Sequence, residues 1–388
     1  MTELLYYKDP YKTEFEASVL SFEKEGDRAF LVLDATSFFP EQGGQYADEG
    51  TINGLKVEDV QLKSGEVIHY MGKDAVFTVG EKVYGKVDFT KRFDRMQNHT
   101  GEHILSGTIH KMTGFDNVGF HLSDDIMTLD INGVMTWEQL RTAERKANEA
   151  VFADLKVDIL YPTDEELKTI EYRSKKEING KVRLVKIGDA DICACCAPHV
   201  AYTGQIGLIK IVKAVKYKSG MRLNVCCGRR ALADYNMRYD EVEKVSVLLS
   251  ARPEEIGSAC ESILDKYEKE KFTLKKIKRE LIKEKISDVE HTGGNLTFEI
   301  EDSDNDDLRE AVNEGVKKCD GICAAYTRTG EGYSFVMGVR EGEFAPYRND
   351  ILTALGGKGG GRGNMISGTL SCDKEKIEEF FKEYKRKQ

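Results

Sequence analysis

The sequence lacks several features that would place it in a specialised class of protein. Its 388 residues include one Trp and six Pro, and no apolar run approaches the roughly 20 residues that span a bilayer. Its opening, MTELLYYKDPYKTEFE, contains no apolar segment of the kind that directs secretion. We therefore expect a cytoplasmic protein of two or three domains without a membrane partner.

Cysteine is too scarce for a disulfide scaffold. The chain has nine Cys, an odd number, and some are adjacent, as at Cys195 and Cys196. Reduced thiols, some of them metal ligands, fit this pattern better. The net charge of −10 also argues against general affinity for nucleic acid.

Acidic residues are missing from one interval, however. Residues 192–233 contain none, but they carry seven Lys and Arg, among them Lys210, Lys213 and Arg222. Residues 168–186 are also largely basic. A surface that faces a polyanion and an ordinary solvated strand-and-turn surface both fit this cluster.

Histidine is also scarce, with seven residues in the chain. Three of them, together with one Cys, form two pairs of possible metal ligands with the same spacing. His99 and His103 lie four apart in NHTGEHILSG, where the apolar period predicts a helix that puts both rings on one face. Cys195 and His199 repeat the spacing in ICACCAPHV, where Pro198 indicates a turn. Three imidazoles and one thiolate suit Zn²⁺, so we predict a zinc site. Surface histidines and an inert core Cys are the alternative.

Two glycine-rich segments are candidate functional motifs. TSFFPEQGGQYADEG separates two predicted strands, and LGGKGGGRGNMISG carries two cations whose neighbouring backbone N–H groups could approach phosphate. The second segment is not a Walker A loop, because no Gly-Lys-Ser/Thr ends it and a helix is expected before it. The alternative is a structural β-turn loop for the first segment and a flexible or tightly turning connector for the second. The candidate phosphate contacts are Gly357, Lys358, Gly360 and Arg362.

The periodicity divides the chain into four parts. Residues 1–90 show short alternating strands, and residues 91–234 mix strands with helices, one of which we expect to begin at a capping box formed by Thr136 and Gln139. Residues 235–290 are helical, and residues 291–388 form an α/β segment.

An apolar stripe runs along the helical part. One helix alone cannot bury such a stripe, so we expect a long helix or a helical hairpin, and a homodimer through residues 235–388 is one interpretation. The stripe consists of Ile263, Tyr267, Leu274, Ile277 and Leu281.

Together these motifs resemble the editing domain of alanyl-tRNA synthetase. The two ligand pairs, the FFPEQGGQ segment and the stretches VRLVKIGD, HVAYTGQIG and RLNVCCGRRAL follow that domain's order, and the GGKGGGRGN tail resembles the DHH-associated C-terminal domain of the synthetase. No aminoacylation core accompanies them, so the chain resembles a free-standing editing protein of the long AlaX type. One departure is Cys-Cys-Ala-Pro-His in place of the usual Cys-Gly-Gly-Thr-His. The role of that Thr cannot be transferred to Pro198, and Cys196 offers an alternative thiolate.

The resemblance implies an α+β fold with a β-rich, barrel-like N-terminal domain, an α/β zinc-containing editing domain, a helical linker and a small α/β C-terminal domain. It also implies zinc-dependent hydrolysis of tRNA(Ala) mischarged with serine or glycine. Thr36, at a position that resembles a serine-reading Thr of the family, is the specificity candidate. Gln45 could hold the ester or the terminal ribose, and Glu102 could accept a proton from water.

Three other classes of function stay open. A DHH phosphoesterase would need an Asp-His-His motif, which this sequence lacks. A tRNA-binding zinc protein would keep the basic stretch and the glycine-rich loop but would have no hydrolytic activity. An unrelated zinc hydrolase would act on another ester and ignore tRNA.

Overall fold

Helices and strands are interleaved along the chain in the computed structural model, which confirms the expected α+β class. The structure describes residues 2–124, 126–174 and 181–385. None of the described helices is both long enough and apolar enough to cross a membrane.

The chain folds as two compact units, residues 1–243 and residues 244–388. The finer division into four parts stays a prediction. Within the basic stretch 168–186, residues 175–180 lie outside the described residues.

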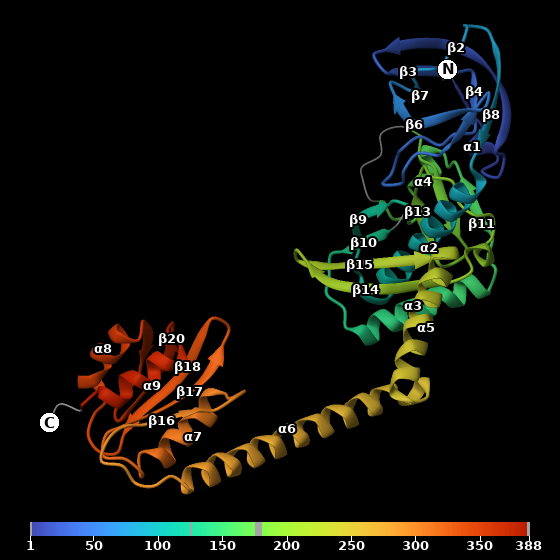
Figure 1. Cartoon of the computed structure of the whole chain (residues 1–388). Helices are drawn as coiled ribbons and strands as arrows, with labels where there is room; N and C mark the ends of the chain where they lie inside the picture. The colour runs from blue at the N-terminus through green and yellow to red at the C-terminus, as the bar shows by residue number, and fades with distance from the viewer. Residues whose placement is uncertain (1, 125, 175–180, 386–388) are drawn as a thin grey trace. The chain divides into compact units, whose positions relative to one another are not determined.

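The first unit begins with a closed barrel of six strands, in which all neighbours are antiparallel (Figure 1). Strand β8 shows why it closes around an apolar core, because Val83 and Val87 point inward while Lys82 and Lys86 face solvent. In order around the barrel, the strands are β2 (Glu14–Glu25), β3 (Arg28–Leu33), β7 (Glu66–Gly72), β6 (Leu55–Lys63), β5 (Gly50–Ile52) and β8 (Lys82–Val87).

Three short elements accompany the barrel. Strand β1 (Glu3–Leu4) pairs in parallel with β4 (Ala35–Thr36), and helix α1 (Leu5–Lys8) follows β1 directly. Between β4 and β5 the chain leaves the barrel as the loop of residues 37–49.

Helix α2 (Phe89–Thr113) leads from the barrel into the rest of the unit. The Asp88 side chain caps it by accepting from the N–H groups of Thr90 and Lys91, and Gly114 ends it with a φ of 72°. Every residue from Arg95 to Gly107 is buried, so the helix runs through the interior of the unit and carries both predicted histidine ligands there.

Two antiparallel sheets and a second long helix complete the first unit. Helix α3 (Trp137–Phe152) begins at the predicted capping box of Thr136 and Gln139, which is confirmed. One sheet has the order β14 (Ile209–Tyr217), β15 (Gly220–Cys227), β10 (Met127–Ile131), β9 (Asn117–Leu122). The other is β11 (Val157–Leu160), β12 (Leu184–Ile187), β13 (Asp191–Ala194), and the short helices are α4 (Asp164–Leu167) and the 3-10 turn η1 (Thr203–Ile206).

The expected helical part is present as two helices. Helix α5 (Arg229–Leu249) crosses the boundary between the units, and after the turn η2 (Pro253–Glu255) helix α6 (Ile256–Ser287) continues for 32 residues. All five residues of the predicted stripe lie on α6 and are exposed, with exposed fractions between 48% and 66%.

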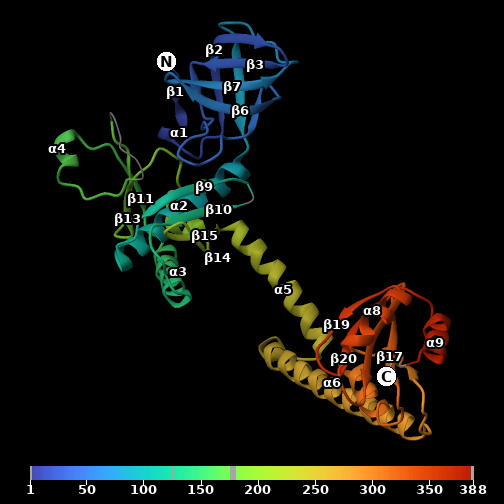
Figure 2. The ribbon, with the colours of Figure 1, turned by 90° about the vertical axis from the view of Figure 1, so that its left-hand side faces the viewer.

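The second unit is built on a five-stranded sheet whose two faces carry separate cores. Successive residues of its second strand, β17, alternate between them: Cys323 and Ala325 pack with α6 and α7, whereas Ala324 and Tyr326 pack with α8 and α9. Figure 2 shows the ribbon of this unit with α6, α8 and α9 labelled. The sheet order is β16 (Leu296–Glu299), β17 (Ile322–Thr329), β18 (Gly332–Val339), β20 (Met365–Leu370), β19 (Gly357–Gly360). The helices are α7 (Asn305–Gly315), α8 (Ala345–Ala354) and α9 (Lys374–Glu383).

The C-terminal glycine-rich segment is not wholly a loop. Helix α8 precedes it, as expected, but Gly357–Gly360 then forms β19, an edge strand paired with β20. Glycine is required there for backbone approach: a Cβ on Gly368 would lie 2.1 Å from the carbonyl oxygen of Lys358, and one on Gly359 would lie 2.5 Å from that of Ser367.

Candidate metal centre

Helix α2 and the turn after β13 bring the four predicted ligands together. His99 and His103 lie one turn apart on the buried helix, and Cys195 and His199 approach them from the turn that contains Pro198. One donor atom from each of the four side chains lies within 4.8 Å of every other, so the group could hold a metal ion. Cys196 is not part of that group; it packs instead beside Tyr6 and Phe39.

The separations suit a tetrahedral ion. The Cys195 Sγ lies 3.5 Å from the Nε2 of His99 and 3.4 Å from the Nε2 of His199. Zinc–sulfur and zinc–nitrogen bonds of about 2.3 and 2.1 Å at a tetrahedral angle would separate the two donors by about 3.6 Å. The four side chains therefore need no large movement to share one ion.

A hydrogen bond to the other ring nitrogen orients each imidazole. The Nδ1–H groups of His99, His103 and His199 donate to the Gln45 Oε1 (2.8 Å), the Asp191 Oδ2 (3.1 Å) and the Thr100 Oγ1 (3.0 Å), respectively. Thr100 can only accept here, because its own hydroxyl donates to the Met96 carbonyl. These bonds leave the Nε2 lone pairs for a metal, which is how metal-binding histidines are usually supported.

One buried atom supports this assignment independently. The Nε2 of His103 has no hydrogen-bond partner among the described residues. Because His103 is only 1% exposed, bulk water does not reach this atom. An unpaired polar atom in the interior costs free energy, and a metal ion would satisfy it.

The surroundings favour the metal-binding forms of two ligands, Cys195 and His199. Burial opposes ionisation of the Cys195 thiol, but His99 and His199 beside it hold its pKa well below the usual range, so the thiolate prevails. Burial lowers the pKa of His199 to about 3, which keeps that ring neutral. A neutral imidazole and a thiolate are the forms that bind metal. For His103 burial lowers the pKa, but Cys193 and Asp191 raise it above the ordinary value, so a metal ion would have to displace a proton from that ring.

Asp191 and Arg173 are functional candidates that sequence reasoning missed. Asp191, with His103 and Cys193, forms a second group whose donor atoms could hold a metal, but Arg173 already binds its two oxygens at 2.8 and 2.9 Å. We interpret Asp191 as the support of His103 rather than as a ligand. Its only sequence signal is its position four residues before Cys195.

The three predicted catalytic residues lie in different surroundings. Gln45 contacts His99, and its Nε2 is buried without a hydrogen-bond partner among the described residues. Glu102 is buried and accepts from the Asn117 Nδ2 at 2.6 Å. Thr36 is buried at the edge of the barrel, where its hydroxyl bonds to the Nε2 of His69 at 2.8 Å and accepts from the Phe38 N–H at 3.1 Å.

The predicted polyanion contacts differ in how freely they could bind phosphate. Lys210 pairs with Glu144 (2.7 Å) and Arg222 pairs with Asp130 through two bonds (2.6 and 2.7 Å), whereas Lys213 is exposed. In the second unit, Gly360, Lys358 and Arg362 are exposed and Gly357 is half-buried, on or just after the edge strand β19.

Two family models match the chain. The model of the "Threonyl and Alanyl tRNA synthetase second additional domain" matches residues 182–224, which include Cys195 and His199. The model of "tRNA synthetases class II (A)" matches residues 4–91.

Curated relatives match nearly the whole chain. The alanyl-tRNA editing protein AlaX-L of Pyrococcus horikoshii is 31% identical over 97% of this chain and 96% of its own length. The alanine–tRNA ligase of Pyrococcus abyssi is 34% identical over 98% of this chain, which spans 43% of that enzyme. The solved C-Ala domain of Aquifex aeolicus alanyl-tRNA synthetase covers 23% of this chain and 87% of its own at 18% identity, with a TM-score of 0.20, too low to support an argument.

Proposed function

Because the chain belongs to the family of alanyl-tRNA editing proteins, we propose that it hydrolyses the ester bond of Ser-tRNA(Ala), and of Gly-tRNA(Ala), in a zinc-dependent reaction. The observation that carries the proposal is the convergence of three imidazole Nε2 atoms and the Cys195 thiolate beside Gln45. A cytoplasmic location follows from the proposed substrate.

His99, His103, Cys195 and His199 would hold the zinc ion. When bound, zinc would fix these side chains and act as a Lewis acid toward an oxygen of the substrate or of water. A site with four protein ligands is coordinatively closed, however, so much of the acceleration would come from side chains that position the ester and water.

Gln45 is the side chain best placed for that positioning. Its carbonyl oxygen is used by His99, and its buried amide nitrogen has two hydrogens to donate. It would donate to the ester carbonyl or to an oxygen of the terminal ribose. Glu102, adjacent to His103, would take a proton from water while Asn117 holds its Oε1.

Thr36 would distinguish serine from alanine by accepting a hydrogen bond. The His69 Nδ1–H donates to the Leu31 carbonyl, so its Nε2 must accept the Thr36 hydroxyl proton. The Phe38 N–H occupies one lone pair of the Thr36 oxygen. The Thr36 oxygen therefore has one lone pair left and no proton to donate. It can accept a hydrogen bond from the serine hydroxyl, which alanine lacks.

Binding of tRNA would draw on both units. Lys213 and the basic stretch around it would meet phosphates near the site, together with Lys210 and Arg222 if the RNA displaces their carboxylate partners. Gly357, Lys358, Gly360 and Arg362 would add contacts from the second unit. We also propose that the exposed stripe on α6 is the contact of a homodimer.

One observation favours a second candidate function. Four protein ligands are typical of structural zinc sites, so a tRNA-binding zinc protein that hydrolyses nothing would have the same quartet. A zinc hydrolase for another ester would keep the quartet but not respond to tRNA.

A deacylation assay separates these functions. The full-length protein is incubated with Ser-tRNA(Ala), Gly-tRNA(Ala) and Ala-tRNA(Ala), before and after zinc removal by a chelator. We expect hydrolysis of the first two substrates, little of the third, and loss of activity on zinc removal that added zinc reverses. Binding of all three without hydrolysis would instead establish the structural-zinc alternative.

A further inference from the structure

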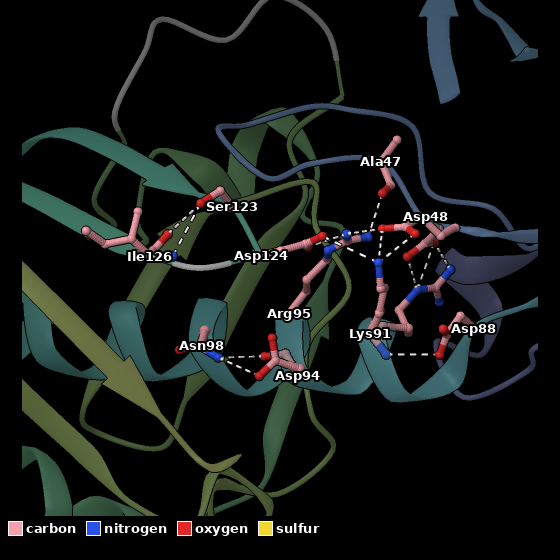
Figure 3. Close-up of polar contacts among 12 residues, drawn as sticks. Ala47, Asp48, Asp88, Lys91, Asp94, Arg95, Asn98, Ser123, Asp124 and Ile126 are labelled. Carbon is pink, nitrogen blue, oxygen red and sulfur yellow. Dashed lines mark hydrogen bonds and ion pairs between the residues drawn. The ribbon is translucent and has the colours of Figure 1, made fainter. Parts of the chain in front are cut away.

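Two buried arginines, Arg92 and Arg95, connect the loop of residues 37–49 to helix α2; Figure 3 shows Arg95 beside Ala47. Arg92 forms an ion pair with Asp48 in which both side chains are 0% exposed, and it also donates to the carbonyls of Ser37 (2.5 Å) and Pro10 (2.9 Å). Arg95 donates to the Ala47 carbonyl at 2.5 Å. Both ends of the loop are therefore held by the helix that carries His99 and His103.

Arg95 is itself held by surrounding carboxylates. Its Nη2 donates to Asp124 at 2.7 Å (Figure 3) and to Glu49 at 3.1 Å. Lys91, one turn earlier on the helix, binds Glu49 at 2.6 Å. Asp48 also closes the loop on itself, because it accepts from the Phe39 N–H at 2.7 Å and donates its own N–H to the Phe39 carbonyl at 2.9 Å.

The tip of the loop is a two-residue glycine turn. Gln42 and Gln45 exchange two backbone hydrogen bonds of 3.1 Å, and Gly43 and Gly44 between them have φ values of 66° and 84°. Positive φ at both central positions is the type I′ geometry that glycine adopts without strain. This turn delivers Gln45 to the Nδ1 of His99.

The turn is also pinned against strand β9. The Leu122 N–H donates to the Gly44 carbonyl at 2.7 Å, and a Cβ on Gly44 would lie 2.6 Å from the Phe120 carbonyl oxygen. The Phe120 ring in turn packs on the His99 ring, with centroids 4.7 Å apart. Gly44 thus lies against the residue that packs on the metal ligand.

We propose that Arg92, Asp48 and Gly44 are positioning residues of the metal centre: they fix the barrel loop so that Gln45 orients His99. The barrel then contributes to the geometry of the metal centre, because its loop supplies the side chain that orients His99. This inference deepens the proposed function and depends on metal binding by the quartet.

If the contacts of Arg92, Asp48 and Gly44 served only to attach the barrel to helix α2, substitutions in them would have a different effect. They would alter stability, but the geometry and affinity of the metal centre would stay the same. Removal of a supporting hydrogen-bond partner of a metal-bound histidine typically lowers metal affinity or activity by about 10–100-fold. The metal itself is therefore the informative probe.

The test compares Gly44→Ala with Gly26→Ala in the full-length protein. Both positions have positive φ, but a Cβ on Gly26 meets nothing within 4 Å, so the control carries the backbone strain without the contact. Each protein is loaded with Co²⁺ for its absorption spectrum, and zinc affinity is measured by competition with a chelator. We expect an altered cobalt spectrum and a roughly 10–100-fold loss of zinc affinity in Gly44→Ala only.

A second pair keeps the test decisive if Gly44→Ala does not fold. Asp48→Asn removes the charge opposite Arg92 and leaves the glycine turn of the loop unchanged, and Asp307→Asn is the control because Asp307 is a buried carboxylate of the second unit. The same spectral change in Asp48→Asn, absent from Asp307→Asn, supports the proposal. An unchanged spectrum and affinity in folded Gly44→Ala or Asp48→Asn overturns it. A wild-type protein that binds neither cobalt nor zinc overturns the proposed function as well.

Discussion

Each compact unit contains a glycine-rich segment, and the two segments use their glycines for different purposes. In the first unit, Gly43 and Gly44 form a turn that brings a polar side chain, Gln45, to a buried histidine. In the second unit, Gly359 and Gly368 let two strands approach so closely that no side chain would fit between them.

The difference lies in what surrounds the glycines. In the part of the chain that the structure describes, the buried Nε2 of Gln45 in the first segment has no hydrogen-bond partner, and neither has the buried Nε2 of His103 on helix α2. The second segment forms an edge strand whose cations, Lys358 and Arg362, are exposed. Glycine content therefore indicates unusual backbone geometry, and only the neighbouring side chains indicate chemistry.

The largest effect should come from the ligands of the first unit. His103→Ala or Cys195→Ala should reduce the zinc content from about one ion per chain to near zero and abolish deacylation, because three ligands bind zinc much more weakly than four. His110→Ala is the control, since His110 lies on the same helix but pairs with Asp116 near the surface. Full zinc content in both variants, measured by elemental analysis, would refute the ligand assignment.

Acidic pH should weaken the barrel through His69. Burial lowers the pKa of His69 to about 4, below the ordinary value of 6.5. The unfolded chain therefore takes up a proton at this residue between pH 6.5 and 4 while the folded chain does not. The stability that the neutral ring contributes is complete above pH 6.5 and is lost as the pH falls toward 4, by up to about 3 kcal/mol. His69→Gln should show a smaller decrease in unfolding free energy over this range, and an identical decrease would contradict the assignment.

A substitution between β19 and β20 should disrupt their close pairing in the second unit without affecting the stability of the first unit. Gly368→Ala should destabilise the second unit by about 1–3 kcal/mol, because its Cβ would overlap the backbone of β19. Gly360→Ala, where a Cβ meets nothing within 4 Å, is the control. The only Trp, Trp137, lies in the first unit. The unfolding transition followed by its fluorescence should therefore not change, whereas circular dichroism should detect the lower stability of the second unit. Reduced zinc content in Gly368→Ala would show that the segments are not independent.

Substrate selection should depend on the first unit as well. Thr36→Val keeps the shape but removes the hydroxyl, so discrimination between seryl and alanyl esters should shrink by about 1–3 kcal/mol. His69 also loses its partner, so the measurement is the ratio of the two deacylation rates at equal folded concentration. An unchanged ratio would mean that Thr36 does not recognise serine.

The smallest effect is expected from the second glycine-rich segment. Changing Lys358 and Arg362 to Gln should weaken tRNA binding slightly and lower the slope of log affinity against log salt by about 1 for each lost phosphate contact. Lys213→Gln gives the matched measurement in the first unit. Equal slopes for wild type and the double variant would restrict the tRNA contacts to other residues.

The sequence predicted the features that depend on local spacing. The i, i+4 histidines required only that residues 89–113 form a helix, and the capping box at Thr136 required only that its own backbone begin one. The long helix after residue 255 followed from its polar and apolar period. In contrast, the edge strand β19 was expected to be a loop, because its pairing depends on β20, and glycine has a low intrinsic preference for strands.

By itself the sequence determined which side chains could ligate a metal, because His and Cys at a fixed spacing carry that chemistry wherever the chain places them. Only the tertiary structure decided what supports them. Each histidine ligand is supported by a side chain that is distant in the sequence: Asp191 supports His103, Gln45 supports His99, and Thr100 supports His199. Only the hydrogen bonds of the folded chain identify these pairs. The same holds for the Arg92–Asp48 pair, whose members are 44 residues apart. Long-range contacts depend on how separate helices and strands pack together, so the spacing of residues within one segment cannot predict them.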